Sequence, residues 1–230
     1  MNIRTTLIAS SLIAASLVSG AAHAVLQGRD LNGSAGSFEA YYDTVLDITW
    51  LANANMNGGM DWAAANTWAA QLNINGYDNW RLPTVEPVNG STFNYSYSTN
   101  GSTDVGYNIT SPQNEMAHLF YVTLGNPGYV TPDGAVSGCG SSANTCLDNV
   151  GPFTNLQADS YWSATEYAPG STSAWRFSML NGGQRASVTG NGLYALAVSP
   201  GDVAAVSEAQ TYALMLAGLG LIGWRARRRG

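Results

Sequence analysis

Lysine is absent from the 230-residue sequence, and histidine and cysteine occur only twice each. The absence of lysine excludes Schiff-base chemistry and a lysine general base. One histidine and one cysteine pair in the body of the chain cannot build a His-rich or Cys-rich zinc or iron site. A Ser-His-Asp triad would need His118, but this residue lies in a predicted helix with no nucleophile-elbow motif nearby. We therefore expect His118 to be a helix-capping or surface residue, and we expect the protein not to be an enzyme.

Positive charge is also scarce in the body of the chain. Residues 25–206 contain four arginines against fourteen acidic residues, which is a net charge of −10. The other five arginines lie at the two ends of the sequence. An electronegative surface of this kind repels phosphate backbones and anionic lipid headgroups. We therefore expect no nucleic-acid partner.

The N-terminus has the three parts of a secretion signal. Arg4 supplies a positive charge, and residues 7–18 form a short apolar run. Ala22 and Ala24 then give the small-x-small pattern that signal peptidase cleaves, directly before Val25. The apolar run is too short to span a bilayer, which argues against a permanent anchor. We expect the secretion machinery to export the chain and to remove this segment.

The C-terminus combines a short apolar run with a basic end. Residues 211–224 would form about 21 Å of helix at about 1.5 Å per residue, against a hydrocarbon core of about 30 Å. The basic end consists of Arg225, Arg227, Arg228 and Arg229. Positive charge beside an apolar segment stays on the cytoplasmic side of a membrane. A marginal span with a basic stop predicts a transient contact with the inner membrane.

This order of a short motif, an apolar run and an arginine cluster resembles the PEP-CTERM sorting signal of Gram-negative bacteria. Val206 and Glu208 match its Val-Pro-Glu-Pro motif, whereas Ser207 and Ala209 stand where the signal has proline. The resemblance implies processing by an exosortase, display at the cell surface or release outside the cell, and an association with exopolysaccharide and biofilm production. Three segments are expected: a signal peptide at 1–24, a folded domain at 25–205 and a sorting tail at 206–230.

Apolar spacing and turn residues predict an α+β domain with a mostly antiparallel sheet. Two helices are expected, one at 61–73 with Asp61 as its N-cap, and one that begins at Ser111 and Pro112 and ends before Gly125. Strands are expected at 38–52, 161–165, 174–180, 184–189 and 193–199. Two long irregular segments, 85–110 and 125–155, interrupt these elements, and loops of such length are usually functional or mobile.

The two cysteines, Cys139 and Cys146, lie close together in a stretch rich in glycine, serine and asparagine. In an exported protein the default for such a pair is a disulfide that closes a small loop. The alternative is a pair of reactive thiols.

The body of the chain contains the strings TWLANAN, GYDNWRLPT, SPQNEMAHLF, YWSAT, AWRFSMLNGGQ and YALAVSPGDV, spread over residues 38–203. Taken together, these strings resemble the Lcl C-terminal-domain-like family. The resemblance implies a C-type-lectin-like fold, which is also related to the fold of formylglycine-generating enzymes. The motif residues, for which we expect structural roles, are Trp80, Arg81, Leu82, Pro83, Tyr161, Trp162, Ser163 and Trp175. For Arg81 we expect an ion pair that fixes a loop, because its planar guanidinium has five donors.

The activities of the related folds do not carry over to this sequence. Formylglycine generation relies on a reactive cysteine pair near the end of the domain, whereas the cysteines here lie in its middle. The loop tripeptides of calcium-dependent lectins are absent. Calcium needs six to eight oxygen ligands, which an acidic, Asn-rich surface can supply, but no spacing selects particular residues. No cofactor is therefore expected, and calcium stays an open alternative.

The leading hypothesis is a non-catalytic domain that binds an extracellular polysaccharide or protein. Aromatic side chains can stack on sugars, although most tryptophans are expected in the core. The body has six of them: Trp50, Trp62, Trp68, Trp80, Trp162 and Trp175. One alternative is a carbohydrate-active enzyme that uses two of the carboxylates Asp43, Asp47, Asp159 and Glu166. The other alternative is a purely structural component of the biofilm matrix.

Overall fold

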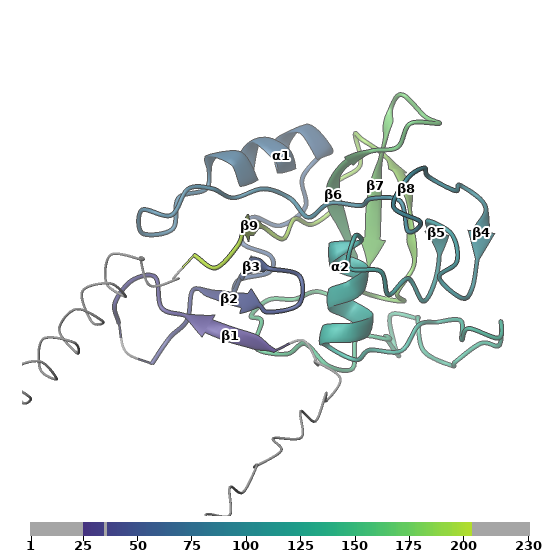
Figure 1. Cartoon of the computed structure of the whole chain (residues 1–230), viewed down its shortest axis with the longest axis horizontal. Coiled ribbons are helices and arrows are strands. Elements are labelled where there is room, and N and C mark those ends of the chain that lie inside the picture. Colours follow the sequence, from purple (N-terminus) through teal and green to yellow (C-terminus); the bar gives the residue numbers. More distant parts are fainter. Residues whose placement is uncertain (1–24, 35, 204–230) are drawn as a thin grey trace, which may run out of the picture.

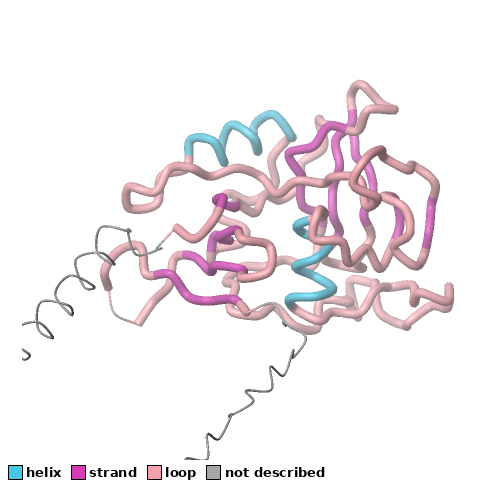
Figure 2. Tube along the Cα trace, viewed as in Figure 1, coloured by secondary structure: helices cyan, strands magenta, loops and turns pink. Residues whose placement is uncertain are grey.

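The computed structural model describes residues 25–34 and 36–203, and it confirms the predicted α+β class with mostly antiparallel sheets. Two sheets lie side by side with the short helix α2 between them, and the longer helix α1 covers one side (Figure 1). Loops and turns make up much of the chain between the short strands (Figure 2). None of the helices described in these ranges is long and apolar enough to cross a membrane. The finer C-type-lectin-like assignment stays a prediction.

The first sheet has four antiparallel strands in the order β1-β2-β3-β9. The strands are β1 (Leu26–Arg29), β2 (Ala40–Asp43), β3 (Ile48–Leu51) and β9 (Val198–Pro200). The strand segment predicted at 38–52 is thus a hairpin, whose turn places Asp47 at a φ of 51°. β1 lies outside the predicted strands because its sequence, LQGR, has no β-branched or aromatic residue. β9, which comes from the C-terminal end of the domain, pairs with β3 and forms the second edge of the sheet.

The second sheet has five strands in the order β4-β5-β8-β7-β6. The strands are β4 (Tyr97–Ser98), β5 (Val105–Gly106), β8 (Gln184–Val188), β7 (Ser173–Ser178) and β6 (Ser160–Glu166). Its pairs are antiparallel except that of β4 with β5. β6, β7 and β8 confirm three of the predicted strands. β4 and β5 come from the segment 85–110, which the sequence predicted to be irregular.

Helix α1 (Trp62–Gln71) begins where the sequence predicts it. The Asp61 carboxylate accepts a hydrogen bond from the Ala64 amide at 2.8 Å and thereby caps the helix. Its buried residues Ala65 and Ala69 pack against Trp162 of β6. Small side chains on this face let the helix approach the sheet closely.

Helix α2 (Glu115–His118) begins later than predicted and continues into a π-helical turn, η1 (Leu119–Thr123). Ser111 and Pro112 belong to a turn before the helix, so the predicted start at these residues is wrong. The reason is that Asn114, which precedes the helix, uses its side chain for tertiary contacts. Its amide donates to the Glu86 carbonyl at 3.0 Å and accepts from the Gln184 side chain at 2.7 Å. Tertiary hydrogen bonds thus replace the local cap.

The main core lies where α2 and η1 contact both sheets. Trp50 of the first sheet, Phe120 of η1 and Phe177 of the second sheet are all fully buried in one cluster. Burying one large apolar side chain contributes about 1.5–3 kcal/mol, so these residues stabilise the arrangement of both sheets around the helix. A smaller cluster beneath α1 contains Trp162 and Leu82.

Candidate functional site

The family-motif residues named from the sequence build the core of the domain. Leu82, Pro83, Tyr161, Trp162, Ser163 and Trp175 are all buried. The Trp80 indole donates to the Tyr77 carbonyl at 2.8 Å. Arg81 makes a bidentate ion pair with Glu115, at 2.6 and 2.8 Å. This pair ties the segment after α1 to the start of α2, and the Glu115 carboxylate also accepts the Thr84 amide at 2.7 Å.

The tryptophans do not form a sugar-stacking surface. Trp50, Trp80, Trp162 and Trp175 are buried, while Trp62 and Trp68 on α1 are half-buried. The Trp62 indole nitrogen donates to the Ser163 carbonyl at 2.8 Å, which ties its polar edge to β6. The expectation that most tryptophans lie in the core is therefore confirmed. Their large apolar area is used in the two cores.

The candidate carboxylates lie in different surroundings, and Asp159 and Glu166 are too far apart to act as a glycosidase pair. Asp43 is fully buried, and its oxygens accept from two backbone amides and from the Thr123 hydroxyl. Asp47 accepts the Tyr42 hydroxyl at 2.8 Å. Asp159 and Glu166 lie at the two ends of β6, which at about 3.3 Å per residue separates them by about 23 Å along the strand. A glycosidase pair needs about 5–10 Å.

His118 is buried, so the expected alternative of a surface position is wrong. Only 5% of the residue is exposed, because the short α2 lies between the two sheets. Its Nδ1 lies 2.9 Å from the Thr110 carbonyl oxygen, and this contact holds the ring against the preceding turn. Within residues 25–34 and 36–203, no group of three or more His, Cys, Asp or Glu side chains could hold a metal ion.

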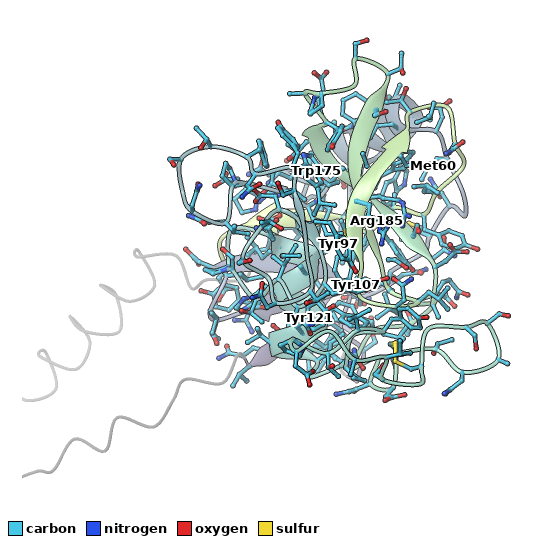
Figure 3. All side chains as sticks on the ribbon, turned by 90° about the vertical axis from the view of Figure 1, so that its right-hand side faces the viewer. Met60, Tyr97, Tyr107, Tyr121, Trp175 and Arg185 are labelled. Atoms are coloured by element: carbon cyan, nitrogen blue, oxygen red, sulfur yellow. A yellow bond between two sulfur atoms is a disulfide. The ribbon has the colours of Figure 1, made fainter. Side chains whose placement is uncertain are left out.

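Tyrosines, not tryptophans, provide the exposed aromatic surface of the second sheet. Tyr97 is 53% exposed, Tyr95 37% and Tyr129 36%, and the largely buried Tyr107 lies between Tyr97 and Tyr129. We call Tyr95, Tyr97, Tyr107 and Tyr129 the aromatic ledge. Figure 3 shows Tyr97 and Tyr107 one below the other, on the side of the molecule that also carries Arg185. The ledge comes from the two long segments that the sequence predicted to be irregular.

Rings beneath and beside Tyr95 hold this end of the ledge in place. Tyr95 stacks on the buried Trp175 with a centroid distance of 6.2 Å, and Tyr167 contacts both rings edge-on at 5.2 and 4.9 Å. Phe93 lies 5.4 Å from Trp175. Such ring contacts contribute about 0.5–1.5 kcal/mol each beyond simple burial. Tyr95 therefore lies on packed aromatic rings, while Tyr97 and Tyr129 pack on the buried Tyr107.

Arg185 adds a positive charge to the ledge. Its guanidinium carbon lies 5.6 Å from the Tyr97 ring centre and 6.0 Å from the Tyr107 ring centre. Arg176 lies directly opposite on the neighbouring strand, and its Nη1 donates to the Ser160 hydroxyl at 2.8 Å. Burial and the nearby Arg185 charge lower the pKa of the Arg176 guanidinium. Among the described residues, Arg29 and Arg81 form ion pairs with carboxylates, whereas Arg176 and Arg185 do not.

The buried Asp104 carboxylate organises the loop that carries Tyr95 and Tyr97. One oxygen accepts the Val88 amide at 2.7 Å, and the other accepts the Asn94 amide at 2.6 Å. The Asp104 carbonyl also accepts the Gln184 side chain at 3.0 Å, which joins the loop to β8. These bonds satisfy a charge that is fully buried and fix both ends of the loop.

Asn108 connects the two long segments to each other. Its side-chain nitrogen donates to the Thr99 carbonyl at 2.6 Å and to the Val130 carbonyl at 2.8 Å. Nearby, Gly106 has a φ of 133°, and a Cβ there would lie 1.8 Å from the Ser98 carbonyl oxygen. Only glycine fits this close approach of β5 to β4. The segments predicted to be irregular are thus held by specific contacts.

The disulfide expected from the sequence is present. Cys139 and Cys146 are joined, and Cys146 is fully buried. The Cys146 amide donates to the Leu180 carbonyl at 2.8 Å, which holds the small loop against the second sheet. The alternative of two reactive thiols is therefore wrong for this structure.

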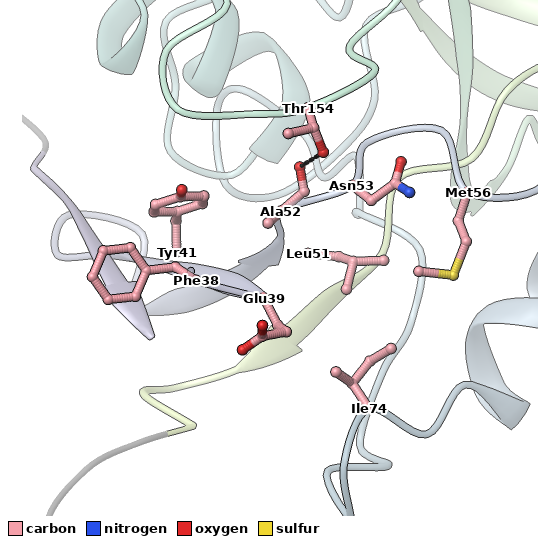
Figure 4. A pocket seen from close by; sticks show the side chains of 9 residues that line it. All are labelled: Phe38, Glu39, Tyr41, Leu51, Ala52, Asn53, Met56, Ile74 and Thr154. Atoms are coloured by element: carbon pink, nitrogen blue, oxygen red, sulfur yellow. Dashed lines mark hydrogen bonds between the residues drawn. The ribbon is translucent and has the colours of Figure 1, made fainter. Parts of the chain in front are cut away.

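An apolar pocket of about 230 Å³ lies at the opposite end of the molecule, beside the first sheet (Figure 4). Tyr41, Leu51 and Ile74 form its apolar walls, together with the exposed side chains of Phe38 and Met56. Its polar groups are few and engaged elsewhere. The Glu39 carboxylate, for example, accepts from the Leu31 amide at 2.9 Å and from the Asn32 side chain.

The processing sites at both ends fall largely outside the described residues. Ala22, Ala24 and all residues from Val206 onward are among the undescribed ones, including the arginine cluster. Val25 is described: it precedes β1, is 53% exposed, and its amide nitrogen lies 3.3 Å from the Thr44 hydroxyl. Cleavage before Val25 stays a prediction.

No sequence motif marks the ledge tyrosines, Arg185 or Asp104 as site residues. One signal was available, because Phe93, Tyr95 and Tyr97 alternate with polar residues in the string STFNYSYS. Alternation of this kind is typical of a strand with one exposed face. Their proximity to Arg185 depends on the pairing of β5 with β8, which no local pattern reveals.

Comparison with known families gives two matches along the chain. A model of the Lcl C-terminal domain matches residues 39–199, which includes the ledge, Arg185 and the disulfide. A model of the PEP-CTERM protein-sorting motif matches residues 205–229. A search of curated proteins gave no match.

Proposed function

Because the chain belongs to the Lcl C-terminal domain family and carries a PEP-CTERM sorting motif behind this domain, we propose that its aromatic ledge binds an extracellular polysaccharide. The sorting motif makes the chain an exported protein that an exosortase sorts to the cell surface. Sorting fixes where the domain acts. The ligand and the absence of catalysis are the proposal.

The observation that supports this proposal most is the exposure of the ledge rings. Tyr97 and Tyr129, each with more than a third of its surface exposed, flank the buried Tyr107, and the equally exposed Tyr95 stacks on the buried Trp175. Aromatic faces carry partial negative charge, so they attract the polarised C–H groups of a sugar ring. The phenol hydroxyls can donate to and accept from sugar hydroxyls at the rim. A rigid surface with both properties suits a polysaccharide chain.

The arrangement of the supporting residues favours binding without large rearrangement. Asp104, Asn108 and the Trp175 layer hold the ledge in one conformation, so little conformational entropy is lost on binding. Arg185 supplies donors beside Tyr97 and Tyr107 without a competing carboxylate among the described residues. These donors can bond sugar hydroxyls or acidic substituents.

The test uses a glycan array and retention on the producer's own exopolysaccharide. We expect the secreted protein to bind and the Tyr97→Ala variant to lose about tenfold in affinity, as ring stacking of about 1–1.5 kcal/mol predicts. Phe38→Ala is the matched control, because Phe38 is also an exposed aromatic residue but lines the apolar pocket at the other end.

Three outcomes of this test would change the proposal. An equal loss of affinity in both variants would show that the ledge is not the specific binding site. If the wild-type protein bound no glycan, the result would favour the purely structural role in the matrix. Hydrolysis of a bound glycan would instead establish the carbohydrate-active alternative.

A further inference from the structure

A second hollow opens beside the disulfide loop, on the same sheet as the ledge. Its volume is about 330 Å³, which lies in the range of pockets that hold small ligands. Four separate segments line it: the loop between the cysteines, the turn before β6, the turn after β7, and the segment before β9. The side chains that matter for its chemistry are Ser142, Thr145, Gln157, Asp159, Leu180 and Tyr194. We call this hollow the hydroxyl pocket.

The lining of the hydroxyl pocket is unusually well suited to sugar hydroxyls. Ser142, Thr145 and Tyr194 each have a hydroxyl that both donates and accepts, and none of the three bonds another described residue through that group. Asp159 uses one carboxylate oxygen to accept the Ser160 amide at 2.7 Å. A carboxylate has room for further donors, such as two neighbouring hydroxyls of one sugar. Leu180 and the Tyr194 ring supply apolar contacts.

The pocket wall is held rigidly, although it belongs to a loop. The disulfide Cys139–Cys146 closes the loop that carries Ser142 and Thr145, and the Cys146 amide bonds the Leu180 carbonyl. Tyr194 is fixed to β6 because its amide donates to the Ser160 carbonyl at 3.0 Å and its ring packs 5.6 Å from that of Tyr161. A preformed site loses little entropy on binding.

A line of polar side chains joins the hydroxyl pocket to the aromatic ledge. Asp159 precedes Ser160 of β6, whose hydroxyl accepts a hydrogen bond from Arg176 of β7. Arg176 lies opposite Arg185 of β8 in the antiparallel register. Arg185 in turn lies over Tyr97 and Tyr107. Figure 3 shows the disulfide, Arg185 and both tyrosines on one face. Strands lie about 4.8 Å apart, so the path from β5 to β6 is about 14 Å long.

We propose that the hydroxyl pocket is a second saccharide subsite, which takes a sugar unit with free neighbouring hydroxyls from the same chain that stacks on the ledge. This proposal rests on the polysaccharide binding proposed above and extends it. A path of about 14 Å is longer than one sugar ring, so the ligand is an extended chain of several units. The two contacts on one chain then add to each other's affinity.

The experiment compares short and long oligosaccharides by titration calorimetry on the secreted protein with its disulfide intact. The probes are the disaccharide and hexasaccharide of four series: cellulose, chitin, mannan and galactan. The pocket variant is Thr145→Val combined with Tyr194→Phe, which removes two hydroxyls and little volume. The matched control is Thr172→Val combined with Tyr77→Phe, which removes the same groups outside the pocket and the ledge.

We expect the wild-type protein to bind one hexasaccharide more tightly than its disaccharide. The pocket variant should lose about tenfold for the hexasaccharide and nothing for the disaccharide, as two hydrogen bonds predict. The control variant should bind like the wild type, and Tyr97→Ala should weaken both probes.

Two results would overturn the proposal in distinguishable ways. If the pocket variant binds the hexasaccharide as tightly as the wild type, or if the wild type does not favour the longer probe, the subsite is wrong and the ledge stands. If the wild type binds no probe of any series, both the proposed subsite and the proposed polysaccharide binding are wrong.

Discussion

The Asp104 carboxylate accepts the backbone amide of Asn94 at 2.6 Å, across a loop that carries the exposed tyrosines of the ledge. Its other oxygen accepts the Val88 amide, so one buried charge holds both ends of the loop. A hydrogen bond to a charged group is stronger than one between neutral groups. The position of the ledge therefore depends on a residue that is itself inaccessible to a ligand.

The Asp104→Asn variant tests this dependence. In this variant a side-chain nitrogen, which is a donor, replaces one of the two oxygens that accept from backbone amides, so two donors would face each other. We therefore expect the free energy of unfolding to fall by about 2 kcal/mol. Ledge binding should fall as well, because the loop loses an anchor. Urea unfolding and glycan titration measure the two effects. Asp148→Asn, at an exposed position, is the control, and a stability loss of equal size in both variants would contradict the role of Asp104.

The ion pair between Arg81 and Glu115 permits a second prediction. The Glu115 side chain is 9% exposed and that of Arg81 is 33% exposed, so solvent screens the pair only in part. Arg81→Met leaves a nearly buried carboxylate unpaired, and we expect it to lower the free energy of unfolding by about 2 kcal/mol. A double-mutant cycle with Glu115→Met should show a coupling energy of about 1–2 kcal/mol. Additive losses would show that the pair contributes no interaction of its own.

The disulfide should stabilise the domain and shape its loop. Cys139 and Cys146 are seven positions apart, and closing so small a loop restricts the unfolded chain by about 2–3 kcal/mol. We expect the double Cys→Ser variant to lose about this much stability in urea, and the wild type to lose it when dithiothreitol is added. The stability of the double Cys→Ser variant should not change when dithiothreitol is added, which is the internal control. An unchanged unfolding midpoint after complete reduction would contradict the prediction.

Local signals in the sequence predicted part of the fold. The sequence predicts Asp61 as an N-cap because its contact to Ala64 lies within one helical turn. The same reasoning failed at Ser111 and Pro112, because the helix start depends on bonds from Asn114 to Glu86 and Gln184, which lie 28 and 70 positions away. A cap pattern describes only neighbours in the chain.

The candidate site was harder to predict than the fold for the same physical reason. Composition correctly indicated an aromatic, non-basic body, but it cannot say which rings a core will bury. All the body tryptophans are at least partly buried, and the exposed rings are tyrosines of a segment with little regular structure. Arg185 reaches Tyr97 only because β8 pairs with β5 at the single register Gly106 to Gln184. Such a contact exists only once the sheet has formed.

The sorting tail gives the last prediction, which rests on its sequence and on the motif matched at 205–229. If the apolar run formed a helix, it would be about 21 Å long and thus shorter than the hydrocarbon core of about 30 Å, so we expect the arginines that follow it to supply much of the attachment to the membrane. We expect replacement of all four by serine to leave most of the protein unprocessed or released with its tail intact. Replacement by lysine keeps the charge and should preserve processing. Intact-mass spectrometry of the secreted and membrane fractions, in cells with and without an exosortase, distinguishes these products. If the serine and lysine variants were trimmed with equal yield, charge would not be what retains the tail, and recognition would depend on the Val206 to Ala209 segment alone.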